Sequence, residues 1–260
     1  MFEPFNRQKA CRHGTMLYNV HDIYVGRSFD LYGEFSEGEV TLLRQLVRPG
    51  QHVVEVGANI GAHTVALAQL VGAGGSVLAF EPQRIVFQTL CANLALNHLT
   101  NVDARHAAVG SAPGAIVVPP LDYRRANNFG GLELGTHRQG ETVPVITLDS
   151  LGLERCALLK IDVEGMEQDV LAGAARTIER CRPAMYVEND RPQKSAALIR
   201  AVDALDYNMY WHRPRLFNPQ NFAGHAENVF GGIVSVNMLC LPKSLPQQIN
   251  GLQPVEVPSA

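Results

Sequence analysis

The stretch His52-Val-Val-Glu-Val-Gly-Ala-Asn-Ile-Gly61 decides how the rest of this chain is interpreted. A short apolar run ends abruptly at Gly57, and Gly61 opens a segment rich in alanine, leucine and valine. This pattern predicts a buried strand, a tight turn and a helix. Glycine lets the backbone approach a small molecule closely, and the first N–H groups of the helix are unpaired and carry partial positive charge. We expect Glu55, near the end of the strand, to face a ligand held on this turn.

The spacing of the glycines narrows the class of ligand. A dinucleotide-binding turn reads G-x-G-x-x-G, and its middle glycine makes room for the pyrophosphate. Here Asn59 occupies the crowded position, which disfavours a pyrophosphate. A nucleoside that carries an ammonium group and no phosphate fits better, and S-adenosylmethionine is such a molecule. Three alternatives stay open: a purely structural turn, a nicotinamide-dependent oxidoreductase, and a non-catalytic nucleoside-binding protein.

Length and composition limit the classes of protein to which this chain can belong. With 260 residues, 46% of them hydrophobic, the chain can bury a full core, most simply as one domain with additions. Its formal net charge of −3 and its lack of long runs of like charge predict no binding to nucleic acid. The N-terminus shows no signal-peptide pattern, and no apolar run reaches the length of about 18 residues that a membrane span needs. We therefore expect a cytoplasmic chain without a membrane span.

The cysteines are scattered singly and form no C-x-x-C pair; they are Cys11, Cys91, Cys156, Cys181 and Cys240. Scattered cysteines in apolar segments are typical of buried, reduced thiols. Cysteine spacing therefore gives no indication of a metal site.

We divide the chain into three parts. An N-terminal extension (1–50) precedes the ligand-binding domain (51–241), and a proline-rich tail (242–260) follows it. In the extension, residues 1–19 show no clear periodicity and are expected to form an arm. Residues 19–25 and 28–32 predict a short hairpin around Gly26-Arg27. The Ser36-Glu-Gly-Glu39 pattern predicts a capped helix that ends at Pro49-Gly50, and the tail is expected to be loosely held or to contact a partner.

Beyond the glycine turn, strands and helices alternate. The helix from about 60 to 71 is followed by a buried strand, Ser76-Val-Leu-Ala-Phe-Glu81, and then by Pro82, which must end it. Glu81 lies 20 residues beyond Gly61, close to where a parallel α/β unit places an acid that accepts hydrogen bonds from ribose hydroxyls. A helix (about 83–97) and a third strand (about 102–109) complete the unit, which predicts a parallel sheet.

The second half repeats the alternation after an insertion at about 111–148. The insertion predicts two strands (115–118 and 142–146) around a polar loop (122–131), and a long insertion is more often functional than idle. The later elements are a strand (157–163), a helix to about 178, a strand (183–187), a helix (195–205) and two closing strands (about 207–211 and 229–241).

Carboxylates collect where strands are predicted to end. Glu55, Glu81, Asp162 and Glu188 close four strands, and Glu164 and Asp190 follow two of them. Because ligands bind beyond the carboxyl ends of parallel strands, these acids are functional candidates. Helix capping, or pairing of Asp162 with Lys160 on the same strand face, is the structural alternative. No spacing of histidines and carboxylates indicates a metal, so we expect none.

Several motifs together resemble the FkbM family of S-adenosylmethionine-dependent methyltransferases. The motifs are Val54-Glu-Val-Gly-Ala-Asn-Ile-Gly61, Ala79-Phe-Glu-Pro82, Ala108-Val-Gly110, Thr147-Leu-Asp149 and Leu159-Lys-Ile-Asp-Val-Glu-Gly-Met-Glu167. The resemblance runs from about residue 32 to 241. It implies a Rossmann-like class I methyltransferase fold, in which helices cover both faces of a mostly parallel seven-stranded sheet. It also implies O-methylation of a small-molecule or carbohydrate acceptor, with S-adenosylhomocysteine as the product.

Site residues follow from the resemblance by position. The loop around Gly57 and Glu55 would hold the methionine end of the cofactor, Glu81 its ribose, and the segment around Ala108 its adenine. Asp162 would lie near the sulfonium and the acceptor. The family more often has aspartate where this chain has Glu55. The cofactor-binding candidates are therefore Glu55, Gly57, Ala58, Asn59, Gly61, Glu81, Pro82, Ala108 and Asp162, and the catalytic candidates are Asp162, Glu164 and Glu188.

The nine histidines show no pattern. His63 is interpreted as a packing residue of the first long helix, whereas His212 and His225 lie in a loop that mixes aromatics, arginines and amides. Such a mixture can stack on and hydrogen-bond sugars or polyols, although a solvated surface loop is the simpler interpretation. The identity of the acceptor is not readable from the sequence, and a homo-oligomer is allowed.

Overall fold

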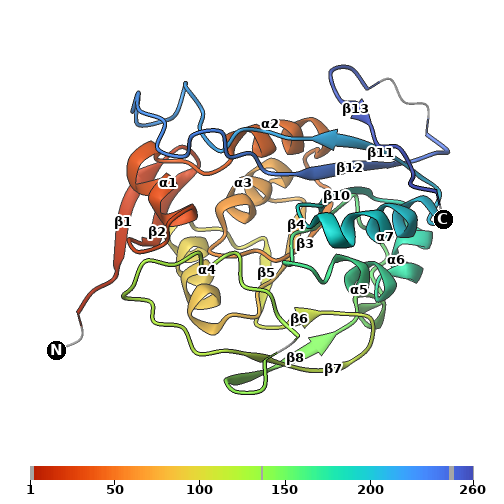
Figure 1. The fold of residues 1–260 in the computed structure, drawn as a ribbon, viewed down its shortest axis with the longest axis horizontal. Coiled ribbons are helices and arrows are strands. Elements are labelled where there is room, and N and C mark those ends of the chain that lie inside the picture. Colours follow the sequence, from red (N-terminus) through yellow and green to blue (C-terminus); the bar gives the residue numbers. More distant parts are fainter. Residues whose placement is uncertain (1–2, 136, 246–248, 260) are drawn as a thin grey trace.

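The computed structural model describes residues 3–135, 137–245 and 249–259 and is built around one large sheet (Figure 1). Within these residues the sheet has eight strands in the order β13-β11-β12-β10-β9-β3-β4-β5. Their bounds are β3 His52–Val56, β4 Ser76–Phe80, β5 Val102–Arg105, β9 Leu158–Ile161, β10 Ala184–Glu188, β11 Tyr207–His212, β12 Asn237–Pro242 and β13 Gln253–Pro254. The five strands from β10 to β5 are parallel, and β12, β11 and β13 continue the sheet with antiparallel pairing.

Helices cover both faces of this sheet, as expected. They are α1 Val25–Tyr32, α2 Glu37–Leu46, α3 Ala62–Val71, α4 Arg84–Leu96, α5 Glu167–Ala172, α6 Ala175–Cys181 and α7 Pro192–Asp203, with a 3-10 turn, η1, at Leu148–Leu151. Val53 packs with the apolar residues of α2, α3 and α4, whereas its neighbour Val54 packs with those of α5, α6 and α7. Adjacent strand residues point to opposite faces, so β3 carries buried valines on both of its faces.

The turn after β3 is fixed by a close approach between two chain segments. Gly57 has φ +85°, and a Cβ built on it would lie 1.7 Å from the backbone carbonyl oxygen of Asp162, which follows β9. Gly61 has φ +88° and precedes α3, so the helix begins at Ala62, two residues later than expected. A side chain at position 57 would push the ends of β3 and β9 apart.

The N-terminal extension differs from the sequence prediction. Residues expected to form an arm make a hairpin, β1 Asn6–Cys11 with β2 Gly14–Asn19, and residues expected to form a hairpin make α1. Val25, Phe29 and Tyr32 recur at helical spacing and are buried. The interpretation of Gly26 as a turn residue is wrong. Glycine is needed there because α1 packs closely against Asn19: a Cβ built on Gly26 would lie 2.0 Å from the carbonyl oxygen of Asn19.

The helix predicted after Ser36 is confirmed, but its expected cap is wrong. Ser36 has φ +45°, makes no side-chain cap bond to the backbone, and donates its hydroxyl to the Glu39 carboxylate at 2.7 Å. The two side chains therefore bond to each other and leave the helix N-terminus without the reciprocal backbone bonds of a capping box.

Three predicted elements are divided or shortened. Residues 102–109 form β5 and a separate strand, β6 Ala108–Val109, which joins β8 Glu141–Ile146 and β7 Gly114–Val118 in a three-stranded sheet with the order β6-β8-β7. The helix expected to run to 178 is interrupted at Gly173, whose ideal Cβ would lie 2.0 Å from the carbonyl oxygen of Gly110. The last long strand begins at Asn237 instead of about 229.

The tail is held against the sheet over part of its length. β13 pairs with β11, and Val255 is buried in the main core. The expectation of a loosely held arm is therefore wrong for residues 253–255, and this strand gives the sheet its eighth member where seven were expected. Residues 246–248 of the tail lie outside the described part of the chain. Every cysteine, all five lying within the described residues, is a free thiol.

We predict that Gly57→Ala lowers the free energy of unfolding by at least about 2 kcal/mol, because the methyl group meets a backbone carbonyl and the positive φ is unfavourable for alanine. Equilibrium urea unfolding measures the loss. Gly152→Ala is the matched control: Gly152 has φ +60° but no atom within 4 Å of its ideal Cβ, so only the backbone cost of about 1 kcal/mol is expected. Equal losses in the two variants would show that the close approach at Gly57 is not a constraint.

Candidate functional site

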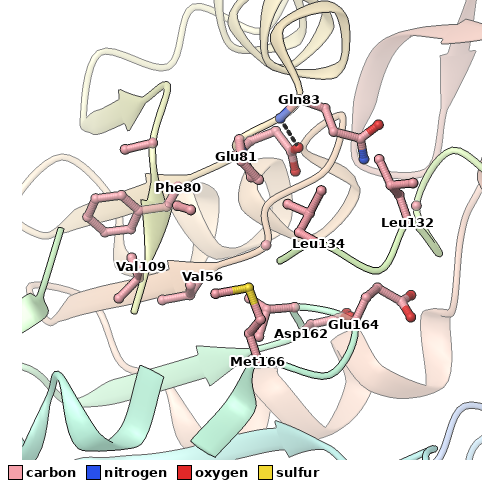
Figure 2. Close-up of a pocket in the computed structure, with 16 residues that line it drawn as sticks. Val56, Phe80, Glu81, Gln83, Val109, Leu132, Leu134, Asp162, Glu164 and Met166 are labelled. Carbon is pink, nitrogen blue, oxygen red and sulfur yellow. Dashed lines mark hydrogen bonds between the residues drawn. The ribbon is translucent and has the colours of Figure 1, made fainter. Parts of the chain in front are cut away.

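A small cavity of about 460 Å³ opens at the carboxyl ends of β3, β4 and β9 (Figure 2). Its walls are mainly apolar and come from β3, β4, β6, the insertion and the segment after β9; they include Val56, Phe80, Val109, Leu132, Leu134 and Met166. Glu81 and Asp162 supply carboxylates at its edge. Such a space accommodates a flat apolar ring system next to a group that hydrogen-bonds carboxylates.

Glu81 ties the glycine turn to the turn after β4. Its two carboxylate oxygens accept hydrogen bonds from the backbone N–H groups of Asn59 (2.9 Å) and Gln83 (2.8 Å). Burial raises the pKa of Glu81 to about 7, although these two N–H groups act in the opposite direction. The carboxyl group that lines the small cavity is therefore held in position by two backbone segments.

A large cleft of about 1080 Å³ adjoins the small cavity. Five residues line both spaces, namely Gly57, Glu81, Gly130, Asp162 and Glu164. Its lining includes the acids at the strand ends, Val25 of α1, and Leu216, Ile233, Val234 and Val236 of the segment between β11 and β12. A ligand bound in the small cavity and a ligand bound in the large cleft can therefore meet at Asp162.

Lys160 lies beneath this junction in an almost dry environment. Its side chain is 2% exposed, and its ammonium nitrogen lies 3.1 Å from Asp162 and 3.6 Å from Glu55. Burial acts to lower the pKa of Lys160, but the charges of Asp162 and Glu55 outweigh it and raise the pKa overall. The lysine is therefore charged and shared by two carboxylates.

Glu55 faces the protein interior in this structure. Its carboxylate accepts a hydrogen bond from the Thr64 hydroxyl at 2.6 Å, and burial raises its pKa in spite of Lys160. Among the residues described as lining the two spaces, Glu55 is absent, whereas Lys160 lines the large cleft. Direct contact of Glu55 with a ligand ammonium stays a prediction, and the structure adds that Lys160 already pairs with this carboxylate.

Three carboxylates cluster at the edge of the large cleft. Oxygen atoms of Asp162, Glu164 and Glu188 lie within 4.8 Å of one another. Glu164 pairs with Arg191, and burial followed by the charges of Asp162 and Asp190 raises its pKa to about 7. Burial and then the charges of Asp162 and Glu164 raise the pKa of Glu188 well above its usual value. The cluster is close enough to share a divalent cation, so the expected absence of a metal stays a prediction.

The remaining candidates are distributed over both spaces. Pro82 and Ala108 line the small cavity, and Ala58 and Asn59 line the large cleft. Gly61 is the residue from which α3 begins and lines neither space in the described chain.

The histidines proposed from the loop lie elsewhere. His212 bonds the Tyr186 hydroxyl at 2.8 Å, and His225 packs its ring 5.6 Å from that of Tyr32. Neither histidine is among the described residues that line the two spaces. His63, interpreted as a packing residue, is buried and also lines the large cleft.

Other lining residues were missed from the sequence. Leu132 and Leu134 carry an apolar alternation within an otherwise polar insertion, which could have indicated them. Asn237 has no such signal, because it reaches the cleft through the antiparallel pairing of β12 with β10, where it lies opposite Glu188.

The mostly parallel sheet, the glycine turn and the acid after the second strand define a class I methyltransferase. The family model described as the methyltransferase FkbM domain matches residues 55–209, more than half of the chain. The chain therefore belongs to the FkbM family of S-adenosylmethionine-dependent methyltransferases. This membership replaces the nicotinamide-dependent alternative.

Two curated relatives are named as methyltransferases. Methyltransferase sdnD of Sordaria araneosa is 32% identical over 154 residues, which cover 46% of this chain and 59% of that protein. Methyltransferase 1 of Beauveria bassiana (strain ARSEF 2860) is 28% identical over 143 residues, which cover 46% of this chain and 57% of that protein. The chain thus spans less than two thirds of the length of the curated relatives that it matches.

A solved structure shares the fold alone. A putative rRNA methylase of Clostridium thermocellum superposes with a TM-score of 0.50 at 11% identity, covering 79% of this chain and 95% of that one. Among the described helices of the present structure, none has the length and apolar character needed to cross a membrane.

We predict that Glu81→Ala weakens S-adenosylmethionine binding by about 1.5–3 kcal/mol, the usual range for a hydrogen bond to a charged group, which corresponds to a Kd about 10- to 150-fold higher. The reason is the expected loss of the carboxylate that receives the ribose. Isothermal titration measures the change. Glu141→Ala, which removes an exposed carboxylate paired with Arg84, is the control and should leave Kd unchanged. A folded Glu81→Ala variant that binds like the wild type would refute the ribose role.

We also predict that S-adenosylmethionine binds more tightly as the pH rises from 6 to 8. The pKa of Glu81 is about 7, so the ionised carboxylate that accepts hydroxyl hydrogen bonds predominates above that pH. At pH 6, binding therefore requires Glu81 to release a proton. This cost disappears by pH 8, so the ionisation of Glu81 alone should lower Kd by about tenfold between pH 6 and pH 8. Glu164 titrates in the same range. The variant Glu81→Gln isolates the contribution of Glu81, and a pH profile identical to that of the wild type would remove Glu81 from this dependence.

Proposed function

We propose that the chain is an O-methyltransferase that acts on a hydroxyl group of a small-molecule or carbohydrate acceptor. The observation that carries the proposal is the position of Asp162, which lines both the small cavity and the large cleft and is held by Lys160. A cofactor in the small cavity can therefore transfer its methyl group to an acceptor in the large cleft beside the Asp162 carboxylate.

The division of the two spaces supports a role for each. The apolar part of the small cavity, with Ala108 and Leu134, suits the adenine, and Glu81 at its edge suits the ribose hydroxyls. The methionine part then extends past Gly57 toward Ala58 and Asn59 in the large cleft. The sulfonium, which is positively charged, comes to lie near the carboxylates of the cluster.

Methyl transfer requires the acceptor oxygen, the methyl carbon and the sulfur in line. The new oxygen–carbon bond forms as the carbon–sulfur bond breaks, and S-adenosylhomocysteine leaves with the electron pair of the broken bond. The hydroxyl proton passes to a carboxylate, for which Asp162 is the first candidate and Glu188 and Glu164 are the next. Positioning by the two spaces supplies much of the acceleration, and the carboxylate adds general-base catalysis.

The charge of the large cleft supports a small acceptor over a nucleic acid. Among the described residues that line it, six carry carboxylates and one, Lys160, carries an ammonium group. A phosphate backbone is repelled by such a wall. The formal net charge of −3 agrees with this proposal.

The proposal is tested by incubating the protein with isotopically labelled S-adenosylmethionine and a panel of hydroxylated compounds. We expect release of S-adenosylhomocysteine together with a product whose labelled methyl group shows the NMR shift of an O–CH₃ group. A product methylated on nitrogen or carbon would contradict O-methylation while leaving the family membership in place.

We predict that Asp162→Asn lowers kcat by about 10²–10⁴-fold, the range typical of losing a general base, while Kd for S-adenosylmethionine changes much less. Asparagine keeps the size of the side chain and removes its charge. Steady-state kinetics with an accepted substrate and titration of the cofactor measure the two effects separately. Glu179→Gln, at an exposed position of α6, is the control.

Two outcomes would contradict this role of Asp162. Normal turnover of Asp162→Asn would transfer the proposed base to Glu188 or Glu164. Complete loss of cofactor binding would assign Asp162 to the cofactor site alone.

A further inference from the structure

The carboxylate cluster joins the ends of two neighbouring parallel strands. Asp162 and Glu164 follow β9, and Glu188 is the last residue of β10, which pairs with β9. One oxygen of each carboxylate lies within 4.8 Å of the corresponding oxygens of the other two. Oxygens on opposite sides of a bound divalent cation are about 4–5 Å apart, because each lies about 2.0–2.6 Å from the ion. The three side chains therefore already have the spacing of ligands around one ion.

The backbone after β9 is held in a fixed turn that brings two of these acids into the large cleft. Glu164 has φ +55°, a conformation that residues other than glycine rarely adopt. The N–H of Gly165 donates to the Glu167 carboxylate at 2.8 Å, and the carbonyl of Gly165 accepts a hydrogen bond from Lys194 at 3.0 Å. Asp162 and Glu164 both line the cleft. The turn thus presents two carboxylates in position before any ligand binds.

The positive charges near the cluster are already in use. Lys160 pairs with Asp162 but is shared with a second acid, and Arg191 pairs with Glu164 but also lies near other acids. Glu188 makes no ion pair with any residue that the structure describes. Because like charges at this distance repel one another, the cluster has negative charge available for a further cation.

Buried polar atoms without partners supply an independent indication of a ligand. Asn237 is 3% exposed and lines the large cleft, and its Nδ2 has no hydrogen-bond partner among the described residues; the same is true of Glu188 Oε2. Asn237 lies directly opposite Glu188 in the pairing of β12 with β10, so their side chains share one face of the sheet. Such buried unpaired atoms are unfavourable unless a ligand or an ion completes them.

The amide of Asn237 can supply a fourth oxygen. Its Nδ2 has no hydrogen bond to lose, so half a turn about the Cβ–Cγ bond brings the amide oxygen to the position of the nitrogen. Amide oxygens bind hard cations as carboxylate oxygens do.

The donor atoms define the kind of ion. The clustered ligands are carboxylates, without histidine or cysteine. Oxygen ligands alone are typical of Mg²⁺, Mn²⁺ and Ca²⁺, whereas thiolates and imidazoles are typical of zinc and copper. Ca²⁺ takes 6–8 oxygen ligands, but Mg²⁺ is commonly held by a few carboxylates and keeps several waters. Because the cluster opens onto a cleft of about 1080 Å³, water or an acceptor oxygen can complete the coordination.

We propose that Asp162, Glu164, Glu188 and the amide oxygen of Asn237 bind one divalent cation of the Mg²⁺ type at the edge of the large cleft. This site replaces the metal-free site expected from the sequence. Spacing within one segment gives no sign of it, because its ligands come from the ends of three strands that lie far apart in the chain.

Binding of the ion is independent of the proposed O-methyl transfer, whereas its role in the reaction rests on that proposal. An acceptor hydroxyl that replaces a water on the ion is oriented beside the cofactor and loses its proton more readily. The proton passes to a carboxylate oxygen that does not bind the ion, and the acceptor oxygen then attacks the methyl group.

The test is direct binding of Mn²⁺ to the full chain after treatment with a chelator. Mn²⁺ replaces Mg²⁺ as the probe because the free ion is counted by its electron paramagnetic resonance signal, and isothermal titration gives Kd. We expect one Mn²⁺ per chain, displacement by excess Mg²⁺, and a rise of Tm with Mn²⁺ concentration.

Variants of the ligands locate the ion. Glu188→Gln and Glu164→Gln should each weaken Mn²⁺ binding at least about tenfold, because each removes a charged ligand. Glu188→Gln should not lower Tm in the absence of the ion, since the side chain has no ion pair to lose. Asn237→Asp should tighten Mn²⁺ binding about tenfold, because it adds a charged ligand beside Glu188. Glu154→Gln, which changes a carboxylate whose side chain is 85% exposed, is the control and should leave Kd unchanged.

Several results would overturn the ion site. They are no binding of Mn²⁺, binding that Glu188→Gln leaves unchanged, binding that Asn237→Asp does not tighten, and weak binding of several ions that Glu154→Gln reduces equally. If an O-methylated product forms in the presence of chelator and no Mn²⁺ binds, the ion site fails and the proposed function stands. If Mn²⁺ binds as expected but the only products carry N–CH₃ or C–CH₃ groups, the proposed function fails and the ion site stands.

Discussion

The ammonium group of Lys160 is the interaction on which the arrangement of the site depends. It lies in the sheet between Glu55 of β3 and Asp162 at the end of β9, with almost no contact with water. Removing one partner of a buried ion pair commonly costs 3–5 kcal/mol, because the other charge is left without compensation. The central strand, the neighbouring strand and the start of α3, through Thr64, are thereby held in one register.

This buried cation leaves the remaining acids of the rim undercompensated. Glu81, Glu164 and Glu188 all have a raised pKa, and burial is the largest cause in each case. Carboxylates in such a state favour ligands that bring positive charge or hydrogen-bond donors. The sulfonium and ammonium groups of S-adenosylmethionine supply the first, and the hydroxyl groups of an acceptor supply the second. In our proposal, the same electrostatic condition serves both the donor and the acceptor.

Much of the candidate cofactor site could be predicted because its segments are local in sequence. Gly57 to Gly61 and Glu81 with Pro82 each follow a short strand with apolar residues on both faces, and short-range patterns reveal such strands. The N-terminal extension was harder to predict, because Val25, Phe29 and Tyr32 bury a stripe of α1 that competes with a turn signal at Gly26. The pairing of the tail with β11 was not predicted either, because it involves two residues from a segment with little apolar pattern.

By itself, the sequence determined the alternation of strands and helices that predicts a parallel sheet, the glycine turn and the acids that end the strands, because each is visible as a pattern within a short segment. The tertiary structure alone decided what those acids face. It turned Glu55 toward Lys160, placed Leu132 and Leu134 of the insertion over the small cavity, and brought His63 and Asn237 into one cleft. These contacts join residues tens to hundreds of positions apart, and their geometry depends on strand register and helix packing, which residue patterns within one segment do not specify.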